Sequence, residues 1–114
     1  MTEYLLLFRN AASPQGYDAA SVDFDAAVPL WGAWIAQIVA EGKFVRSEPL
    51  TFEGSVVRPG NTHKGPHIEQ NQALAGFLIC RAESQADAER IAAGCPIFQY
   101  PNPSVEIRAI IPFS

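Results

Sequence analysis

The pattern of hydrophobic positions predicts three buried strands. Residues 4–8 (YLLLF) and 74–80 (LAGFLIC) are apolar at almost every position, which is typical of strands buried on both faces. Residues 105–111 alternate instead, with apolar and charged side chains on opposite faces. The first two strands therefore need cover on two sides, and the last needs it on one.

A segment after the first strand carries the period of an amphipathic helix. Its apolar residues fall at i, i+3, i+4 and i+7: Trp31, Trp34, Ile35 and Ile38. Because Pro29 fits the first turn of a helix better than its interior, we expect the helix to start near residue 27, with Asp23 or Asp25 as its cap. Gly42 then ends it.

A second helix has clear ends. Ser84 is a good N-cap residue, and Asp87 three residues later completes an approximate capping box. Gly94 supplies a stop after Ala93, and Pro96 prevents the helix from continuing. The sequence therefore predicts a helix between the strand at 74–80 and the last strand.

The middle of the chain predicts two short strands and a long loop. Residues 44–50 and 55–58 look like a hairpin-like pair, and Pro59 and Gly60 close the second strand. Residues 61–73 are polar and follow neither hydrophobic period, so we expect a loop there. Loops of this length in small domains tend to be functional or mobile.

These elements predict one α+β domain spanning residues 1–114. Their order is the ferredoxin-like βαββαβ arrangement, in which short connections place both helices on one face of an antiparallel sheet. Two helices cover only one face, yet two of the strands are apolar on both. The second face must also be hidden, and the simplest cover is the same face of a second copy, which makes a homodimer.

Composition narrows the classes of partner. The formal net charge is −4 with a pI near 5.0, and no basic stripe is present, so a nucleic-acid partner is not expected. No apolar run approaches the roughly 18 residues of a membrane span, and the N-terminus lacks a signal-peptide pattern. We therefore expect a cytoplasmic protein without a membrane partner. Cys80 and Cys95 follow no metal or disulfide spacing and are expected to be reduced.

Both histidines of the chain fall within one short segment. His63, Lys64 and His67 surround a Gly-Pro pair, and Glu69 follows. Either histidine could move a proton near neutral pH, and Lys64 could hold a carboxylate or an enolate-like oxygen. The alternatives are a solvated polar loop, which is common, and a metal site formed with Glu69, which the neighbouring Lys64 would oppose.

Other residues are weaker candidates. Trp34 could form the apolar wall of a ligand pocket, although its spacing also fits the buried side of the helix. Arg58, at a strand end, could orient an acidic substrate or form a surface ion pair. Cys95 follows a helix end and could be exposed, but no activating base is adjacent in the sequence. No dinucleotide, nucleotide-phosphate or hydrolase motif occurs, so we expect no cofactor and a diffusible small molecule.

Four stretches together resemble the YCII-related family, also called the DGPF-domain family. They are EYLLLF, WGAWIAQIVAEGKFV, KGPHIEQNQALAGF and CPIFQYPNPSVEIRAII. The family's most diagnostic stretch is approximately TDGPFxExKEQLGGF, and the residues that match it are Gly65, Pro66, Glu69, Leu74, Gly76 and Phe77. The resemblance implies a dimeric α+β barrel in which two sheets pack face to face. It also implies that many relatives have no known activity, while some are considered enzyme-like or act on small ring-opened or lactone compounds.

This sequence departs from the family at positions where chemistry would be expected. The motif's Asp is Lys64 here, its Thr is His63 and its Phe is His67. Some relatives are thought to use a His and Asp pair with the His nearer the N-terminus, but no His precedes His63. Two hypotheses follow. The first is a cofactor-free protein that binds or converts a small acidic or lactone-like metabolite between the sheet, the first helix and residues 63–69. The second is a non-catalytic dimeric binding or accessory module.

Overall fold

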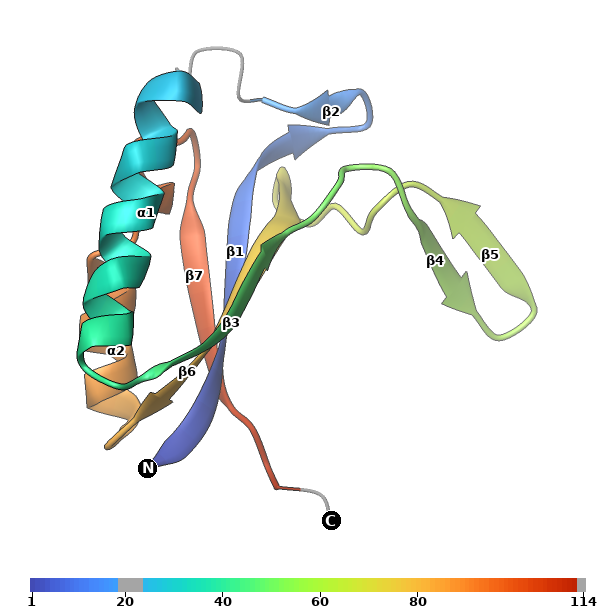
Figure 1. Cartoon of the computed structure of the whole chain (residues 1–114). Coiled ribbons are helices and arrows are strands. Elements are labelled where there is room, and N and C mark those ends of the chain that lie inside the picture. Colours follow the sequence, from blue (N-terminus) through green and yellow to red (C-terminus); the bar gives the residue numbers. More distant parts are fainter. Residues whose placement is uncertain (19–23, 113–114) are drawn as a thin grey trace.

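The computed structural model describes residues 1–18 and 24–112, apart from the side chains of residues 24 and 25. A curved antiparallel sheet is covered on one side by two helices (Figure 1). The elements are β1 (Thr2–Ser13), β2 (Gly16–Tyr17), α1 (Phe24–Ala40), β3 (Phe44–Pro49), β4 (Ser55–Arg58), β5 (Asn61–Lys64), β6 (Gln72–Ala82), α2 (Gln85–Ala93), the 3-10 helix η1 (Pro96–Gln99) and β7 (Ser104–Ala109). The predicted α+β fold is confirmed.

The main sheet has β1 and β6 at its centre. β3 pairs with β6 on one side, β7 pairs with β1 on the other, and β2 pairs with the end of β1. All of these pairs are antiparallel. The neighbours β7–β1–β6–β3 thus give the ferredoxin-like arrangement that the order of helices and strands predicts.

The core lies between the sheet and the two helices. Alternate residues of β1 are buried, because side chains of a strand point to opposite faces in turn. They pack with β6 and with the buried sides of both helices, and the core includes Tyr4, Leu6, Phe8, Trp34, Ile38, Leu78, Cys80, Ala88 and Ile91. Leu6 and Leu78 are fully buried. The predicted hydrophobic stripe of α1 therefore faces the sheet.

The ends of the second helix are as predicted. The Asp87 N–H donates to Ser84 Oγ at 3.1 Å, and the helix runs to Ala93 before Gly94. The first helix differs from the prediction, because it begins at Phe24 and keeps Pro29 inside. Pro29 lacks only the N–H that would bond the carbonyl oxygen of residue 25, near the start of the helix. The side chains proposed as its cap, Asp23 and Asp25, lie outside the described residues.

The predicted strand pairing in the middle of the chain is wrong. β3 pairs with β6 in the main sheet, whereas β4 pairs with β5 in a separate two-stranded sheet. Pro59 and Gly60 form the connecting turn, and Gly60 has φ of 76°, which favours glycine. Residues 61–64 are thus a strand, not the start of a loop. The strand could not be predicted from the hydrophobic pattern, because its residues are polar and it buries neither face.

The sheet leaves its second face uncovered by the described chain. Cross-strand pairing places Leu5 opposite Ile79 and Leu7 opposite Phe77, and all four are only partly buried. Charged residues of β3 and β7 flank this apolar centre, and Arg9 of β1 bonds Glu106 of β7 at 2.7 Å. We call this surface the open face. No described helix is long and apolar enough to cross a lipid bilayer.

Candidate functional site

Three of the predicted site residues lie on the hairpin formed by β4 and β5, residues 55–64, which we call the arm. Arg58 ends β4, and His63 and Lys64 end β5. His63 pairs with Val56 across the arm, and its Nε2 lies 3.1 Å from Nδ2 of Asn61. All three predicted residues are exposed. The arm therefore carries a small group of hydrogen-bond donors in full contact with water.

The arm separates two residues that the sequence analysis placed in one site. Successive side chains of a strand point to opposite faces, so His63 and Lys64 lie on opposite sides of the arm. The register places Arg58 on the same side as His63, because it pairs with Asn61. Val57 and Thr62 share the other side with Lys64. A ligand lying flat on the arm would therefore meet His63 with Arg58, or Lys64 with Val57.

His67 and Glu69 come together just beyond the arm. Their Nε2 and Oε2 atoms are 3.5 Å apart, and the two side chains are 61% and 76% exposed. A carboxylate at this distance can orient the imidazole ring. The pair is the one predicted acid–base contact that the described residues bring together.

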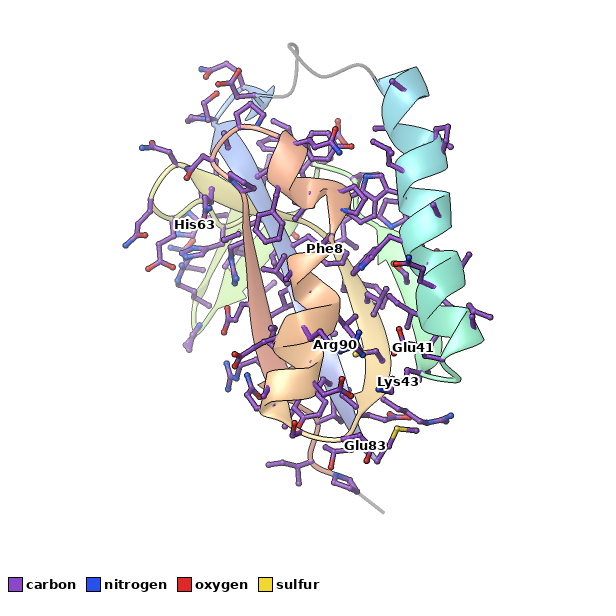
Figure 2. All side chains as sticks on the ribbon, turned by 90° about the vertical axis from the view of Figure 1, so that its left-hand side faces the viewer. Phe8, Glu41, Lys43, His63, Glu83 and Arg90 are labelled. Atoms are coloured by element: carbon purple, nitrogen blue, oxygen red, sulfur yellow. The ribbon has the colours of Figure 1, made fainter. Side chains whose placement is uncertain are left out.

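Trp34 belongs to α1, which covers the side of the sheet opposite the arm (Figure 1). It is 6% exposed, and its Nε1–H donates to the Ile91 carbonyl oxygen at 3.0 Å. It lines a hollow of about 370 Å³ between α1 and η1. Figure 2, seen from the helix side, shows Phe8 behind the helices and His63 to one side on the arm.

The predicted pocket between the sheet, the first helix and residues 63–69 is therefore not formed among the described residues of one chain. Short connections place both helices on one face, whereas the arm extends from the opposite side of the sheet (Figure 1). The sheet itself separates Trp34 from His63. A site that includes His63 must take its other wall from somewhere else.

A second hollow, of about 400 Å³, was not predicted from the sequence. It lies at the turn between β1 and β2 and includes Ser13, Gln15, Tyr17 and Asn71. The Tyr17 hydroxyl donates to the Leu74 carbonyl oxygen, and burial raises the pKa of Tyr17. The Ser-Pro-Gly sequence of the turn was visible, but nothing in it indicates a concave surface. None of the predicted site residues lines this hollow.

The two cysteines are free and buried. Burial raises the pKa of the Cys80 thiol to about 11 and that of Cys95 to about 12. Cys95 is only 3% exposed, so the expectation that it could be exposed is wrong. It lies under η1, where the Ile97 N–H donates to its Sγ. Both thiols stay protonated near neutral pH, and neither is placed for nucleophilic chemistry.

Among the described carboxyl groups, the one whose pKa is lowered most belongs to an ion network between α2 and the start of β3. Asp87 Oδ2 accepts a hydrogen bond from Lys43 Nζ at 2.7 Å, and Arg90 bridges Asp87 and Glu41. Figure 2 shows Arg90, Glu41 and Lys43 close together below the core. The Lys43 bond, followed by the Glu83 N–H, holds the pKa of Asp87 far below its usual range. Every charge in the network has a partner, so it is best explained as a clamp that holds α2 to the sheet.

This network predicts a loss of stability in acid. The pKa of Asp87 is lower in the folded chain than in the unfolded one, where it is about 3.9. Its contribution is complete above the unfolded value and is lost as the pH falls below it. We expect the free energy of unfolding, measured with urea from about pH 7 to pH 2, to decline in this range.

The test variant is Asp87→Asn, and the matched control is Glu89→Gln. Each replaces one acidic residue of α2 by its amide. Asp87→Asn should be less stable than the wild type at neutral pH and should lose much of the acid-induced decline. Glu89 is exposed, so Glu89→Gln should keep the wild-type profile. Equal pH profiles for Asp87→Asn and the wild type would show that this carboxylate does not cause the decline.

The described residues contain no group of three or more histidine, cysteine or acidic side chains that could hold a metal ion. His63 contacts Asn61, and His67 contacts Glu69, so the two imidazoles have separate neighbours. The metal interpretation of the segment thus gains no support from its geometry.

Comparison with known proteins shows the family to which the chain belongs. A family model described as the YCII-related domain matches residues 12–114. No curated protein matches the chain. The matched range includes the arm, the His67–Glu69 pair, both helices and three of the four main strands over their whole length.

Proposed function

Because the chain belongs to the YCII-related family, we propose that it is a homodimer, formed through the open face, that binds a small acidic or lactone-like metabolite at residues 58–69. One observation carries the proposal: no described residue of the same chain covers the apolar centre of the sheet on its open face. The free, buried cysteines are in keeping with work in the reducing cytoplasm.

The open face supports self-association. Leu5, Leu7, Phe77 and Ile79 form a continuous apolar centre across the two middle strands. Contiguous apolar surface on a monomer marks an interaction site, because removing it from water contributes about 25 cal/mol per Å². A two-fold axis through this face would bring the same residues together from both subunits, since an isologous interface uses one patch twice.

The charge of the segment supports an acidic ligand. Residues 55–67 contain Arg58, Lys64 and both histidines but no acidic residue, in a chain whose formal net charge is −4. Guanidinium, ammonium and imidazolium groups all bind carboxylates through charge-assisted hydrogen bonds. If the ligand is also converted, His67 is the best acid or base, because Glu69 lies beside its ring.

The alternative is a non-catalytic dimeric binding or accessory module. Its support is the Lys64 that stands where the family motif has an Asp, together with the exposure of both histidines. General acid–base catalysis is most effective in a site that excludes water. An exposed imidazole does not lie in such a site. Both hypotheses share the ligand class and the dimer, and they differ in whether product forms.

The dimer is tested by placing a charge in the middle of the open face. We expect Leu7→Arg to weaken dimerisation at least tenfold, because it brings two like charges into the apolar centre of the symmetric interface. Sedimentation velocity over a concentration series measures the effect. Val39→Arg is the control, because Val39 is 54% exposed on α1, away from this face. A wild type that stays monomeric at high concentration would contradict the proposed dimer.

The ligand is tested by a thermal-shift screen of small carboxylates, lactones and aromatic acids. A ligand at a hundred times its dissociation constant stabilises by about 2.7 kcal/mol, which raises the melting temperature by several degrees. We expect Lys64→Ala to weaken the binding of a hit by about tenfold, since hydrogen bonds to charged groups contribute about 1.5–3 kcal/mol.

Arg81→Ala serves as the matched control, because Arg81 is a half-exposed cation on the main sheet, outside the arm. Affinity that is equal in Lys64→Ala and the wild type would remove Lys64 from the site. Turnover of the hit then separates the two hypotheses. Product that disappears in His67→Ala supports conversion, whereas saturable binding without product supports the binding module.

A further inference from the structure

Among the described residues, the two strands of the arm pair only with each other. They form a separate two-stranded sheet, and only Val56 among the residues of β4 and β5 is partly buried. Val57 is 76% exposed, although its side chain is apolar. An isolated two-stranded hairpin is only marginally stable in water. Packing against a further surface would therefore stabilise the arm in its extended form.

The base of the arm is fixed, so its direction is set by the fold. The Gly65 N–H donates to the Gly54 carbonyl oxygen at 2.7 Å, which closes the base. Phe52, just before β4, packs edge-on against Tyr17 with ring centroids 5.1 Å apart. The base is thus tied to β2, while the hairpin beyond it leaves the sheet.

The arm points away from the helices, toward the side of the open face. Figure 1 shows α1 and α2 on one side of the sheet and β4–β5 extending from the other. The view turned by 90° agrees, with the helices in front and the arm behind the sheet (Figure 2). A second copy seated on the open face would therefore lie beside the arm.

Resting on the homodimer proposed above, we infer that each arm packs along the partner subunit, so that the two arms clasp the dimer. Two-fold symmetry makes the exchange reciprocal, since each arm meets the same surface of the other copy. Val57 would then enter the interface, and the arm would gain packing that the described residues of its own chain do not provide.

Charge favours a second copy as the occupant. The arm carries Arg58 and Lys64 and no acidic residue, whereas the chain as a whole has 12 acidic residues against 8 Lys and Arg. The body of a second copy is thus an acidic partner for a cationic arm. Complementary charges across an interface steer association and fix the register of the partners.

The size of the open face leads to the same occupant. β1, β6, β3 and β7 have 12, 11, 6 and 6 residues, and strands of these lengths cover roughly 550 Å² in projection. Stable interfaces bury about 800 Å² of accessible surface on each partner. Contact between each arm and the partner would bring a small sheet interface toward the size of a stable one.

The clasp also changes where the ligand site would lie. The arm would carry His63 and Arg58, or Lys64 on its other side, onto the partner. The second wall that the arm lacks in its own chain would then come from the other subunit, and ligand binding would strengthen the dimer.

The test removes the arm and compares the result with the intact chain. Because the ends of the arm lie side by side at Gly54 and Gly65, residues 56–63 can be replaced by two glycines that close a short turn. We expect this variant and Val57→Asp to raise the dimer dissociation constant at least tenfold in sedimentation velocity. Val39→Asp is the matched control, because Val39 is also an exposed valine but lies on α1. It should leave the dimer dissociation constant unchanged.

Hydrogen exchange of the intact chain gives an independent measurement. The amides of residues 55–64 should be protected at concentrations where the dimer forms, and they should lose protection on dilution to the monomer or in Leu7→Arg. A dimer that forms equally well without the arm, with arm amides exchanging at the rate of a free peptide, overturns the clasp and leaves the sheet dimer standing. A wild type that is monomeric throughout overturns the proposed dimer itself, and with it the clasp.

Discussion

Trp34→Ala is expected to lower the free energy of unfolding by about 3–5 kcal/mol, the usual cost of truncating a buried tryptophan. Trp34 is 6% exposed and packs its ring edge-on against Phe8, with centroids 6.0 Å apart. The Ile91 carbonyl oxygen that loses its indole donor still accepts the Gly94 N–H at 3.3 Å, so most of the loss comes from the cavity. Urea unfolding at neutral pH measures it directly.

Trp31→Ala is the matched comparison. Trp31 is only partly buried, and its Nε1–H donates to the Tyr100 hydroxyl at 3.2 Å near the edge of the core. Its removal should cost clearly less than that of Trp34. A stable Trp34→Ala protein that no longer binds a ligand would contradict the structural role and support the pocket wall that the sequence suggested.

Gly76→Ala should cost about 2–3 kcal/mol of unfolding free energy, toward the upper end of what over-packing usually costs. A Cβ at Gly76 would lie 2.9 Å from the Glu48 carbonyl oxygen and 3.3 Å from Pro49 Cα. Both neighbours are backbone atoms of β3, which pairs with β6 at this point. Because no side chain can rotate away, the two strands must move apart. This gives a physical reason for the glycine before Phe77.

Gly32→Ala is a control of opposite sign. Gly32 lies inside α1, and a Cβ there would meet nothing within 4 Å. Alanine is preferred to glycine in a helix interior by about 0.8–1.0 kcal/mol, so this variant should be more stable than the wild type. Chemical unfolding of both variants under one condition compares them. A Gly76→Ala protein as stable as the wild type would show that β3 can move away from β6 without lowering the free energy of unfolding.

The candidate site was predicted in part. The sequence showed that the histidines share one segment, and the structure brings His67 and Glu69 together. It also separates His63 from Lys64, since neighbours on a strand face opposite ways. That separation was hidden because residues 61–64 are polar throughout. Strand formation there follows from the turn at Pro59 and Gly60 and from pairing with β4, and neither leaves a hydrophobic period.

By itself, the sequence determined the elements whose formation depends on burial. The main strands β1, β6 and β7 and both helices were predicted because a buried face requires apolar residues at the period of its backbone, and Leu6, Ile38 and Leu78 lie in the core accordingly. Only the tertiary structure decided how exposed residues lie relative to one another. Trp34 and His63 are on opposite sides of the sheet because the connections place both helices on one face and the arm on the other, and a hydrophobic period carries no information about that.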